Sequence, residues 1–133
     1  TVAALETLKS IAQGRKIAAL GDMAELGSET EAGHREVGRK LMECGIEAVF
    51  LVGDLVSLIE DELRARRYGG KIFRYKDADE ARIPIQNFLL PGDTILVKGS
   101  QGMRMEKIVA EIMAEPQRKK ELLVRQSKRW LSK

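Results

Sequence analysis

The sequence predicts an α/β fold in which helices cover both faces of a mostly parallel sheet. Three short apolar runs, and a fourth and more mixed run after a glycine turn, have the length of strands, and each is followed by a segment with apolar residues at helical spacing. Three of the four runs also end at a glycine followed by a polar residue. Strands that alternate with helices in this way indicate βαβ units with right-handed crossovers. We therefore expect a Rossmann-like three-layer sandwich.

The chain opens inside a helical pattern, because Val2, Leu5, Leu8 and Ile11 recur every three residues. It begins on Thr1 rather than on methionine, so we expect a piece of a longer protein. The predicted strands are KIAAL (16–20), AVFLV (48–52), KIFRY (71–75) and TILVK (94–98). The further helices are predicted in ETEAGHREVGRKLMEC (29–44), LVSLIEDELRARR (55–67), DADEARIPIQNFL (77–89) and MRMEKIVAEIMA (103–114).

Local signals mark some of these boundaries. Ser28 and Glu31 have the spacing of a capping box, which indicates the start of a helix. Pro84 lies past the first turn of its helix and is expected to kink or shorten it. The LPGD segment at residues 90–93 is typical of a type II turn and precedes the fourth strand.

The last part of the chain differs from the rest in charge. Residues 116–133 hold seven basic residues and one acid, Glu121, which gives +6 and leaves 16 basic and 19 acidic residues, or −3, in residues 1–115. We expect residues 1–115 to form the domain and residues 116–133 a basic amphipathic helix with Leu123, Val124, Trp130 and Leu131 on one side. Such a helix docks on the domain, lies weakly on an anionic membrane surface, or binds an acidic protein partner.

The composition is that of a globular protein. With 133 residues, 44% of them hydrophobic and 32% charged, the chain is long enough to bury a core. No apolar run approaches the roughly 18 residues of a membrane span, and no leader pattern opens the chain, so we expect a soluble, cytoplasmic protein. Cys44 is the only cysteine, which excludes an internal disulfide. Because the positive charge is concentrated in the tail, we expect no nucleic-acid partner for the domain.

Polar residues follow three of the predicted strands at one edge of the sheet. They come in the pairs Gly21–Asp22, Gly53–Asp54 and Gly99–Ser100. In open parallel sheets ligands bind beyond the carboxyl ends of the strands, so these loops are the candidate site. Each glycine also has a structural explanation, because glycine permits tight turns and close approach of backbones. Lys98 is either an anion contact at this edge or a solvated side chain.

A complete catalytic apparatus is missing from the sequence. The GxGxxG fingerprint and the P-loop are both absent, so neither bound NAD nor the usual cradle for ATP phosphates is expected. His34, the only histidine, is interpreted as a surface or capping residue or, alternatively, as a catalytic base. Asp22 and Glu25 suit a magnesium ion, but acids are also common at helix N-termini. We expect no catalytic residue and no metal site in this chain.

Two sequence blocks carry a family resemblance. The segments GRKIAALGDMAELGSETEAGHREVG (14–38) and DTILVKGSQGMRMEKIV (93–109) resemble the C-terminal domain of the bacterial Mur ligases, over residues 1 to about 114. LGDMAELG with His34 downstream, together with LVKGS followed by ME, resembles the branch that adds D-alanyl-D-alanine to UDP-N-acetylmuramoyl-tripeptide. The folylpolyglutamate synthetase branch shares the architecture but should lack LGDMAELG.

The resemblance implies a part in an ATP-dependent amide ligation of peptidoglycan synthesis, in which the amine of D-alanyl-D-alanine attacks an acyl phosphate. In such enzymes a central domain carries the P-loop and the magnesium ligands, and an N-terminal domain carries the UDP-sugar. ATP and Mg²⁺ would thus be bound mainly by domains missing from this sequence. The C-terminal domain of such enzymes swings on a hinge, closes over ATP and helps to hold the incoming dipeptide. We therefore expect this chain alone to be inactive.

The resemblance also assigns residues to the cleft that this closure forms. The first loop contributes Gly21, Asp22 and Met23, and the second contributes Lys98, Gly99 and Ser100. Lys98 or Ser100 would pair with the terminal carboxylate or polar groups of the dipeptide, and Asp22 would orient its amine or a water. The alternative is a free-standing binding module of the same shape, which takes a small anion or nucleotide in its glycine loops and a partner on its tail.

Overall fold

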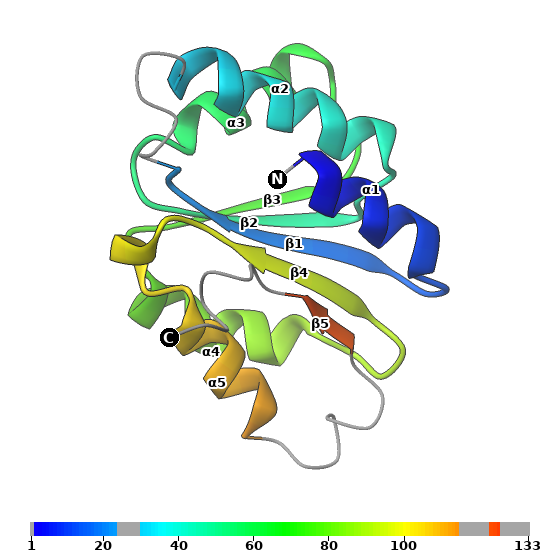
Figure 1. Ribbon diagram of the computed structural model, residues 1–133, viewed down its shortest axis with the longest axis vertical. Coiled ribbons are helices and arrows are strands. Elements are labelled where there is room, and N and C mark those ends of the chain that lie inside the picture. The colour runs from blue at the N-terminus through cyan, green and yellow to red at the C-terminus, as the bar shows by residue number, and fades with distance from the viewer. Residues whose placement is uncertain (1, 24–29, 115–122, 126–133) are drawn as a thin grey trace.

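The computed structural model describes residues 2–23, 30–114 and 123–125 and has the predicted three layers (Figure 1). The strands are β1 (Lys16–Gly21), β2 (Ala48–Val52), β3 (Lys71–Tyr75), β4 (Thr94–Lys98) and β5 (Leu123–Arg125). The helices are α1 (Val2–Ile11), α2 (Thr30–Glu43), α3 (Ser57–Ala65), α4 (Ala78–Phe88), the 3₁₀ helix η2 (Gln101–Met103) and α5 (Glu106–Met113). All the strands are parallel, in the order β3-β2-β1-β4-β5.

The central strand β1 is buried on both faces, and its side chains alternate between two hydrophobic cores. Ala18 and Leu20 belong to the core beneath α1, α2 and α3, whereas Ile17 and Ala19 belong to the core beneath α4 and α5. Figure 1 shows these two groups of helices on opposite sides of the sheet. Enclosure on both faces explains why the strand is a continuous apolar run rather than an alternating one. The predicted α/β sandwich is confirmed.

The tail departs from its predicted structure. Leu123–Arg125 form β5, which pairs in parallel with β4 and places Leu123 opposite Thr94. The predicted amphipathic helix is therefore wrong over these three residues, because an extended segment satisfies the backbone groups at the edge of β4 and a helix cannot. The remainder of that predicted helix, including Trp130 and Leu131, lies outside the described residues.

Pro84 does not shorten its helix, and α5 begins later than the sequence predicts. α4 continues through Pro84 to Phe88, so the predicted shortening is wrong. This helix is held by an N-terminal cap, in which the Asp77 carboxylate accepts the Glu80 N–H at 2.9 Å, and by the burial of Ile85. α5 begins at Glu106 rather than at residue 103, because η2 and a left-handed residue at position 104 precede it. The capping box of Ser28 lies outside the described residues.

The turn before β4 has the predicted type II geometry. Gly92 has a φ of 91°, which this turn requires at its third position, and the Asp93 N–H donates to the Leu90 carbonyl at 3.1 Å. The turn carries Asp93 back toward the start of β1, where its side chain is 3% exposed.

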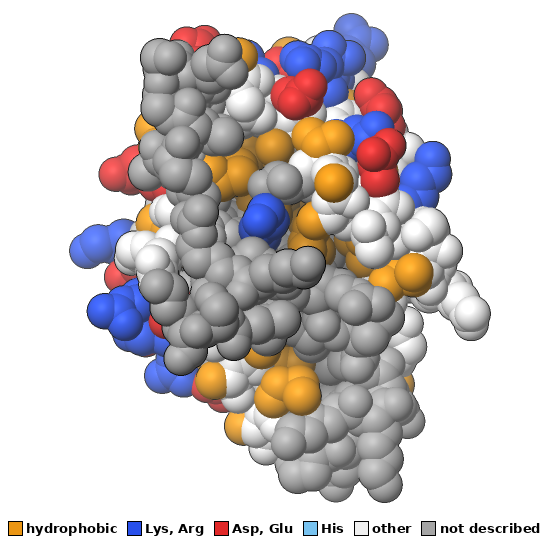
Figure 2. Space-filling model, viewed as in Figure 1, with side chains coloured by type: hydrophobic (Ala, Val, Ile, Leu, Met, Phe, Trp, Pro, Cys, Tyr) orange, Lys and Arg blue, Asp and Glu red, His pale blue; other side chains and the backbone are white. Residues whose placement is uncertain are grey.

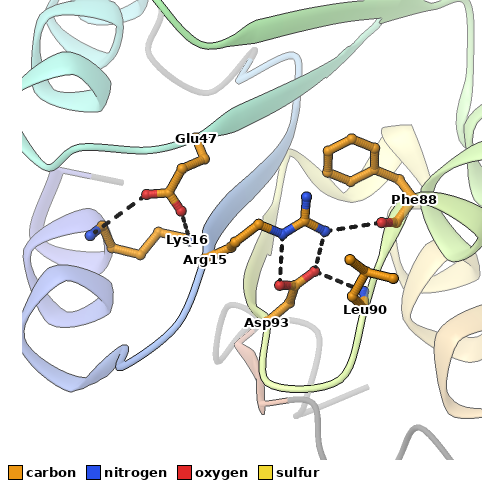
Figure 3. Close-up of polar contacts among 6 residues, drawn as sticks. All are labelled: Arg15, Lys16, Glu47, Phe88, Leu90 and Asp93. Carbon is orange, nitrogen blue, oxygen red and sulfur yellow. Dashed lines mark hydrogen bonds and ion pairs between the residues drawn. The ribbon is translucent and has the colours of Figure 1, made fainter.

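Arg15 and Asp93 join the amino ends of β1 and β4 (Figure 3). The guanidinium donates from Nε to Oδ1 of Asp93 at 2.9 Å and from Nη2 to Oδ2 at 2.6 Å, a bidentate geometry. It also donates to the Phe88 carbonyl at 3.1 Å and lies 4.6 Å from the centre of the Phe88 ring. The Leu90 N–H donates to Asp93 at 2.8 Å. One carboxylate thus fixes the turn, the end of α4 and the start of β1.

Charges of both signs are interleaved over the helices on the α2 side of the sheet (Figure 2). Lys40 pairs with Glu6 at 2.9 Å and with Glu43 at 3.3 Å, and Arg35 pairs with Glu31 at 3.1 Å. Exposed pairs of this kind contribute little to stability and keep the helices solvated. Within the described part of the chain, every helix is too short or too polar to cross a membrane.

Tyr68 should make the domain sensitive to alkali. Its hydroxyl donates to the Ile46 carbonyl at 2.5 Å, and burial raises the pKa of Tyr68 to about 12 from an ordinary value of 10.0. Between these two pH values the Tyr68 hydroxyl ionises in the unfolded chain but not in the folded one. The free energy of unfolding should therefore fall as the pH rises from about 10 to about 12. The measurement is the urea midpoint of the wild type and of Tyr68→Phe across this range. An equal fall in both proteins would show that other groups cause the loss.

Candidate functional site

Three strand ends come together at the carboxyl edge of the sheet. β2, β1 and β4 are neighbours, with Gly21 opposite Val52 and Leu20 opposite Lys98. The glycines that follow these strands therefore lie side by side, as the sequence predicted. This is the edge at which open parallel sheets bind their ligands.

Asp22 connects all three of these strand ends. Its Oδ2 accepts the Asp54 N–H at 3.1 Å, and its Oδ1 accepts the Val56 N–H at 3.0 Å. Its backbone carbonyl accepts the Ser100 N–H at 2.9 Å. The carboxylate therefore faces the loop after β2, and the main chain faces the loop after β4.

Gly53 leaves the space that the Asp22 carboxylate occupies. A Cβ at this position would lie 2.7 Å from Cγ and Oδ2 of Asp22, and the φ of 110° also disfavours other residues. The Gly53 N–H donates to the Tyr75 carbonyl at 2.9 Å, and the Gly53 carbonyl accepts from Arg74 at 2.8 Å. The sequence reasoning missed Arg74, since no motif marks it and its partner is 21 residues away.

Arg74 is itself held by Glu60 on α3, at 2.9 Å. Burial tends to raise the pKa of Glu60, but the hydrogen bonds from Arg74 and Arg64 outweigh burial and hold it below its usual value. The end of β2 is therefore buttressed by an ionised carboxylate at neutral pH.

Gly21 and Gly99 allow β1 and β4 to approach each other at their ends. A Cβ on Gly99 would lie 3.1 Å from the Gly21 Cα and 2.9 Å from Cγ of Met105. A Cβ on Gly21 would lie 3.0 Å from the Met105 sulfur and 3.2 Å from the Met103 side chain. Both glycines thus permit close approach of the two backbones, which was the structural interpretation offered for them.

His34 is fully buried, so its interpretation as a surface residue is wrong. Its Nε2 accepts the backbone N–H of Met23 at 3.3 Å. Nε2 therefore serves as the acceptor for this backbone group. The sequence held a signal for burial, because His34 stands three and seven residues before Val37 and Leu41 on the inner stripe of α2.

Met23 contributes to the core rather than to the open edge of the site. Its side chain is 5% exposed and belongs to the core beneath α1, α2 and α3. His34 and Met23 together secure the main chain directly after Asp22. Glu25, the other residue of the suggested magnesium pair, lies outside the described residues.

Lys98 and Ser100 are the half-buried polar side chains at the end of β4. Within the described ranges, Lys98 forms no ion pair, and the Ser100 hydroxyl makes no cap to η2. The Lys98 ammonium and the Ser100 hydroxyl therefore lie at this edge with no hydrogen-bond or ion-pair partner among the described residues. In the same part of the chain, no three histidine, cysteine or acidic residues are grouped as metal ligands.

Comparison with known protein families shows to which family this chain belongs. The sequence profile described as "Mur ligase, glutamate ligase domain" matches residues 1–101. The chain belongs to the Mur ligase family. The match ends at the first residue of η2, and α5 and β5 follow it along the chain.

Curated relatives of this Mur ligase domain include two UDP-N-acetylmuramoyl-tripeptide–D-alanyl-D-alanine ligases. The protein from Bacillus subtilis is 30% identical over 115 residues, which cover 86% of this chain and 25% of the relative. The protein from Escherichia coli is 36% identical over 96 residues, which cover 72% and 20%. The chain therefore spans a quarter or less of the length of these relatives.

Solved structures agree on the fold. MurF from Acinetobacter baumannii superimposes with a TM-score of 0.69 at 23% identity, covering 86% of this chain and 26% of that one. MurF from Thermotoga maritima in complex with ADP gives a TM-score of 0.66 at 23% identity, covering 87% and 25%.

Proposed function

We propose that this Mur ligase domain is the closing domain of an ATP-dependent ligase that adds D-alanyl-D-alanine to UDP-N-acetylmuramoyl-tripeptide in peptidoglycan synthesis. The observation that carries the proposal is the pairing of this family match with the Lys98 ammonium and the Ser100 hydroxyl, two polar groups that have no described hydrogen-bond or ion-pair partner at the carboxyl end of β4. The relatives named above catalyse this addition, according to their names. We place the enzyme in the cytoplasm.

Lys98 and Ser100 suit the terminal carboxylate of the dipeptide. An ammonium supplies a charge and rotatable donors, and a hydroxyl supplies one further hydrogen bond. In this proposal the loop holds the dipeptide while its amine faces the acyl group, which ATP activates as an acyl phosphate. ATP and Mg²⁺ are held mainly by the central domain and the UDP-sugar by the N-terminal domain of the longer chain. No P-loop occurs in this sequence, so the 133-residue chain alone should neither hydrolyse ATP nor form the amide.

In the full-length ligase, Lys98→Ala and Ser100→Ala should raise the KM for D-alanyl-D-alanine by about 10- to 100-fold and the KM for ATP much less. The reason is the loss of a charge-assisted hydrogen bond made to one substrate only. Steady-state kinetics with each substrate varied in turn provide the measurement. Lys71→Ala is the matched control, because Lys71 is an exposed lysine at the amino end of β3. Equal changes in both KM values would assign the loop to closure rather than to dipeptide binding.

A further inference from the structure

We propose that Asp22 is a positioning residue that ties the main chain directly after β1, at Asp22 and Met23, to the loops after β2 and β4, so that Lys98 and Ser100 are presented in a fixed arrangement. This differs from a direct contact between Asp22 and the amine or a water. The part of the proposal that concerns substrate binding by Lys98 and Ser100 rests on the proposed function. The coupling between the loops does not, because it depends only on contacts within this domain.

The orientation of the carboxylate is the first observation. Each of its oxygens accepts a backbone N–H from the loop after β2, at 3.1 Å from Asp54 and 3.0 Å from Val56. Bonds from N–H groups to an ionised acceptor are stronger than neutral ones. The two bonds reach 32 and 34 residues along the chain, so they act between loops rather than within one. Both carboxylate oxygens of Asp22 are thus hydrogen-bonded to the loop after β2.

The space at Gly53 is the second and independent observation. Its Cα hydrogen faces the carboxylate, and a Cβ there would lie 2.7 Å from Oδ2 of Asp22. The loop after β2 is therefore shaped around this one side chain. Arg74 and Tyr75 hold Gly53 from the opposite side, so the loop cannot simply move away to accommodate a change.

The link to the substrate loop runs through the main chain of Asp22. Its carbonyl accepts the Ser100 N–H at 2.9 Å, and Ser100 in turn accepts the Met103 N–H at 3.0 Å at the start of η2. Next to this link, the Met23 N–H is held by buried His34. Rotation of the Asp22 peptide is therefore restrained on both sides, and its side chain supplies one of the restraints.

The first test measures hydrogen exchange of single amides in the 133-residue protein. Asp22→Ala removes the carboxylate but keeps the carbonyl that accepts the Ser100 N–H, so faster exchange at Ser100 reports coupling between the loops. We expect an increase of about tenfold or more at Ser100, with Leu96 in β4 unchanged as the sign of an intact fold. Loss of protection at Asp54 and Val56 with Ser100 unchanged would overturn the proposal.

Two further variants keep this test decisive if Asp22→Ala disturbs folding. Asp22→Asn preserves the shape of the side chain and one acceptor oxygen, but its amide N–H would face one of the two backbone N–H groups that the carboxylate binds. It should therefore increase the exchange rate at Ser100 by less than Asp22→Ala does. Asp54→Ala is the matched control, because its carboxylate is exposed and forms no hydrogen bond or ion pair with the described residues, whereas its backbone N–H, which binds Asp22, is retained. Faster Ser100 exchange in Asp54→Ala would show that any loss of charge loosens the edge, which contradicts the proposal.

The second test separates positioning from direct contact in the full-length ligase. A positioning role predicts that Asp22→Asn raises the KM for the dipeptide, and that adding it to Ser100→Ala gives less than the product of the two effects. A direct contact with the amine predicts a fall in kcat with a changed pH profile and no change in amide exchange. If Ser100→Ala leaves the KM for the dipeptide unchanged, the proposed contact between Ser100 and the dipeptide fails, and the exchange experiment still decides the role of Asp22.

Discussion

Asp93→Ala is expected to lower the free energy of unfolding by about 3 kcal/mol, since it leaves the Arg15 guanidinium and the Leu90 N–H without their shared partner. Asp93 is almost fully buried, whereas the Arg15 side chain is 35% exposed and partly recovers water, so we expect the low end of the range for broken ion pairs. Urea denaturation measures the change. A melting temperature lower by about 10 °C should accompany it in a domain of this size.

A matched control for this prediction is Asp79→Ala on α4. The Asp79 side chain is 61% exposed and pairs with Lys107 at 3.0 Å, so its loss should cost no more than about 1 kcal/mol. Asp93→Asn should fall between the two, because it retains an acceptor for the Leu90 N–H but loses the charge facing Arg15. A cost below about 1 kcal/mol for Asp93→Ala would mean that the pair is dispensable.

Phe50→Ala is expected to cost about 3–5 kcal/mol, the usual range for removing a buried phenylalanine. Phe50 on β2 is 1% exposed and stacks on Phe73 with ring centres 4.8 Å apart. It also meets the edge of Phe88 at 5.3 Å, the same ring over which Arg15 lies. The substitution therefore opens a cavity between the sheet and α4. Equilibrium unfolding in urea gives the loss of stability.

Two variants show whether the cavity causes this loss. Phe50→Leu keeps most of the volume and should cost about half as much or less. Ile83→Ala removes a side chain that is 42% exposed on α4 and should change stability by about 0.5 kcal/mol or less. Equal losses for Phe50→Leu and Phe50→Ala would indicate that contacts between aromatic rings, rather than buried volume, hold this part of the core.

The sequence was a good guide to the sheet, because β1, β2 and β4 are apolar runs with their own boundaries and β3 directly follows a pair of glycines. Ile17 to Leu20 are buried on both faces, so no alternation was available, and strand length and flanking glycines identified the strand instead. The same glycines predicted which edge would gather the candidate site. Its ligand contacts at Lys98 and Ser100 remain predictions.

The features that sequence reasoning missed depend on contacts between distant residues. Arg15 and Asp93 are 78 positions apart, and Asp22 reaches a loop more than 30 positions away. No local periodicity encodes such pairs, since they exist only after the strands have been ordered. α5 began later than predicted because Arg104 adopts a φ of 56°, a left-handed conformation that arginine rarely takes and that its identity does not reveal.

The short strand β5 places residues beyond the change in charge in the same sheet as β4. With Leu123 beside Thr94 and Lys16 on the opposite side, the first half of β4 is an inner strand rather than a border. A protein trimmed at the change in charge near residue 115 would turn β4 into an open edge, which is prone to pairing with other chains and to local opening. The strand that carries Lys98 would then lie at an edge of the sheet, as β3 does. The change in charge near residue 115 therefore does not coincide with the last strand of the sheet, which Leu123–Arg125 form.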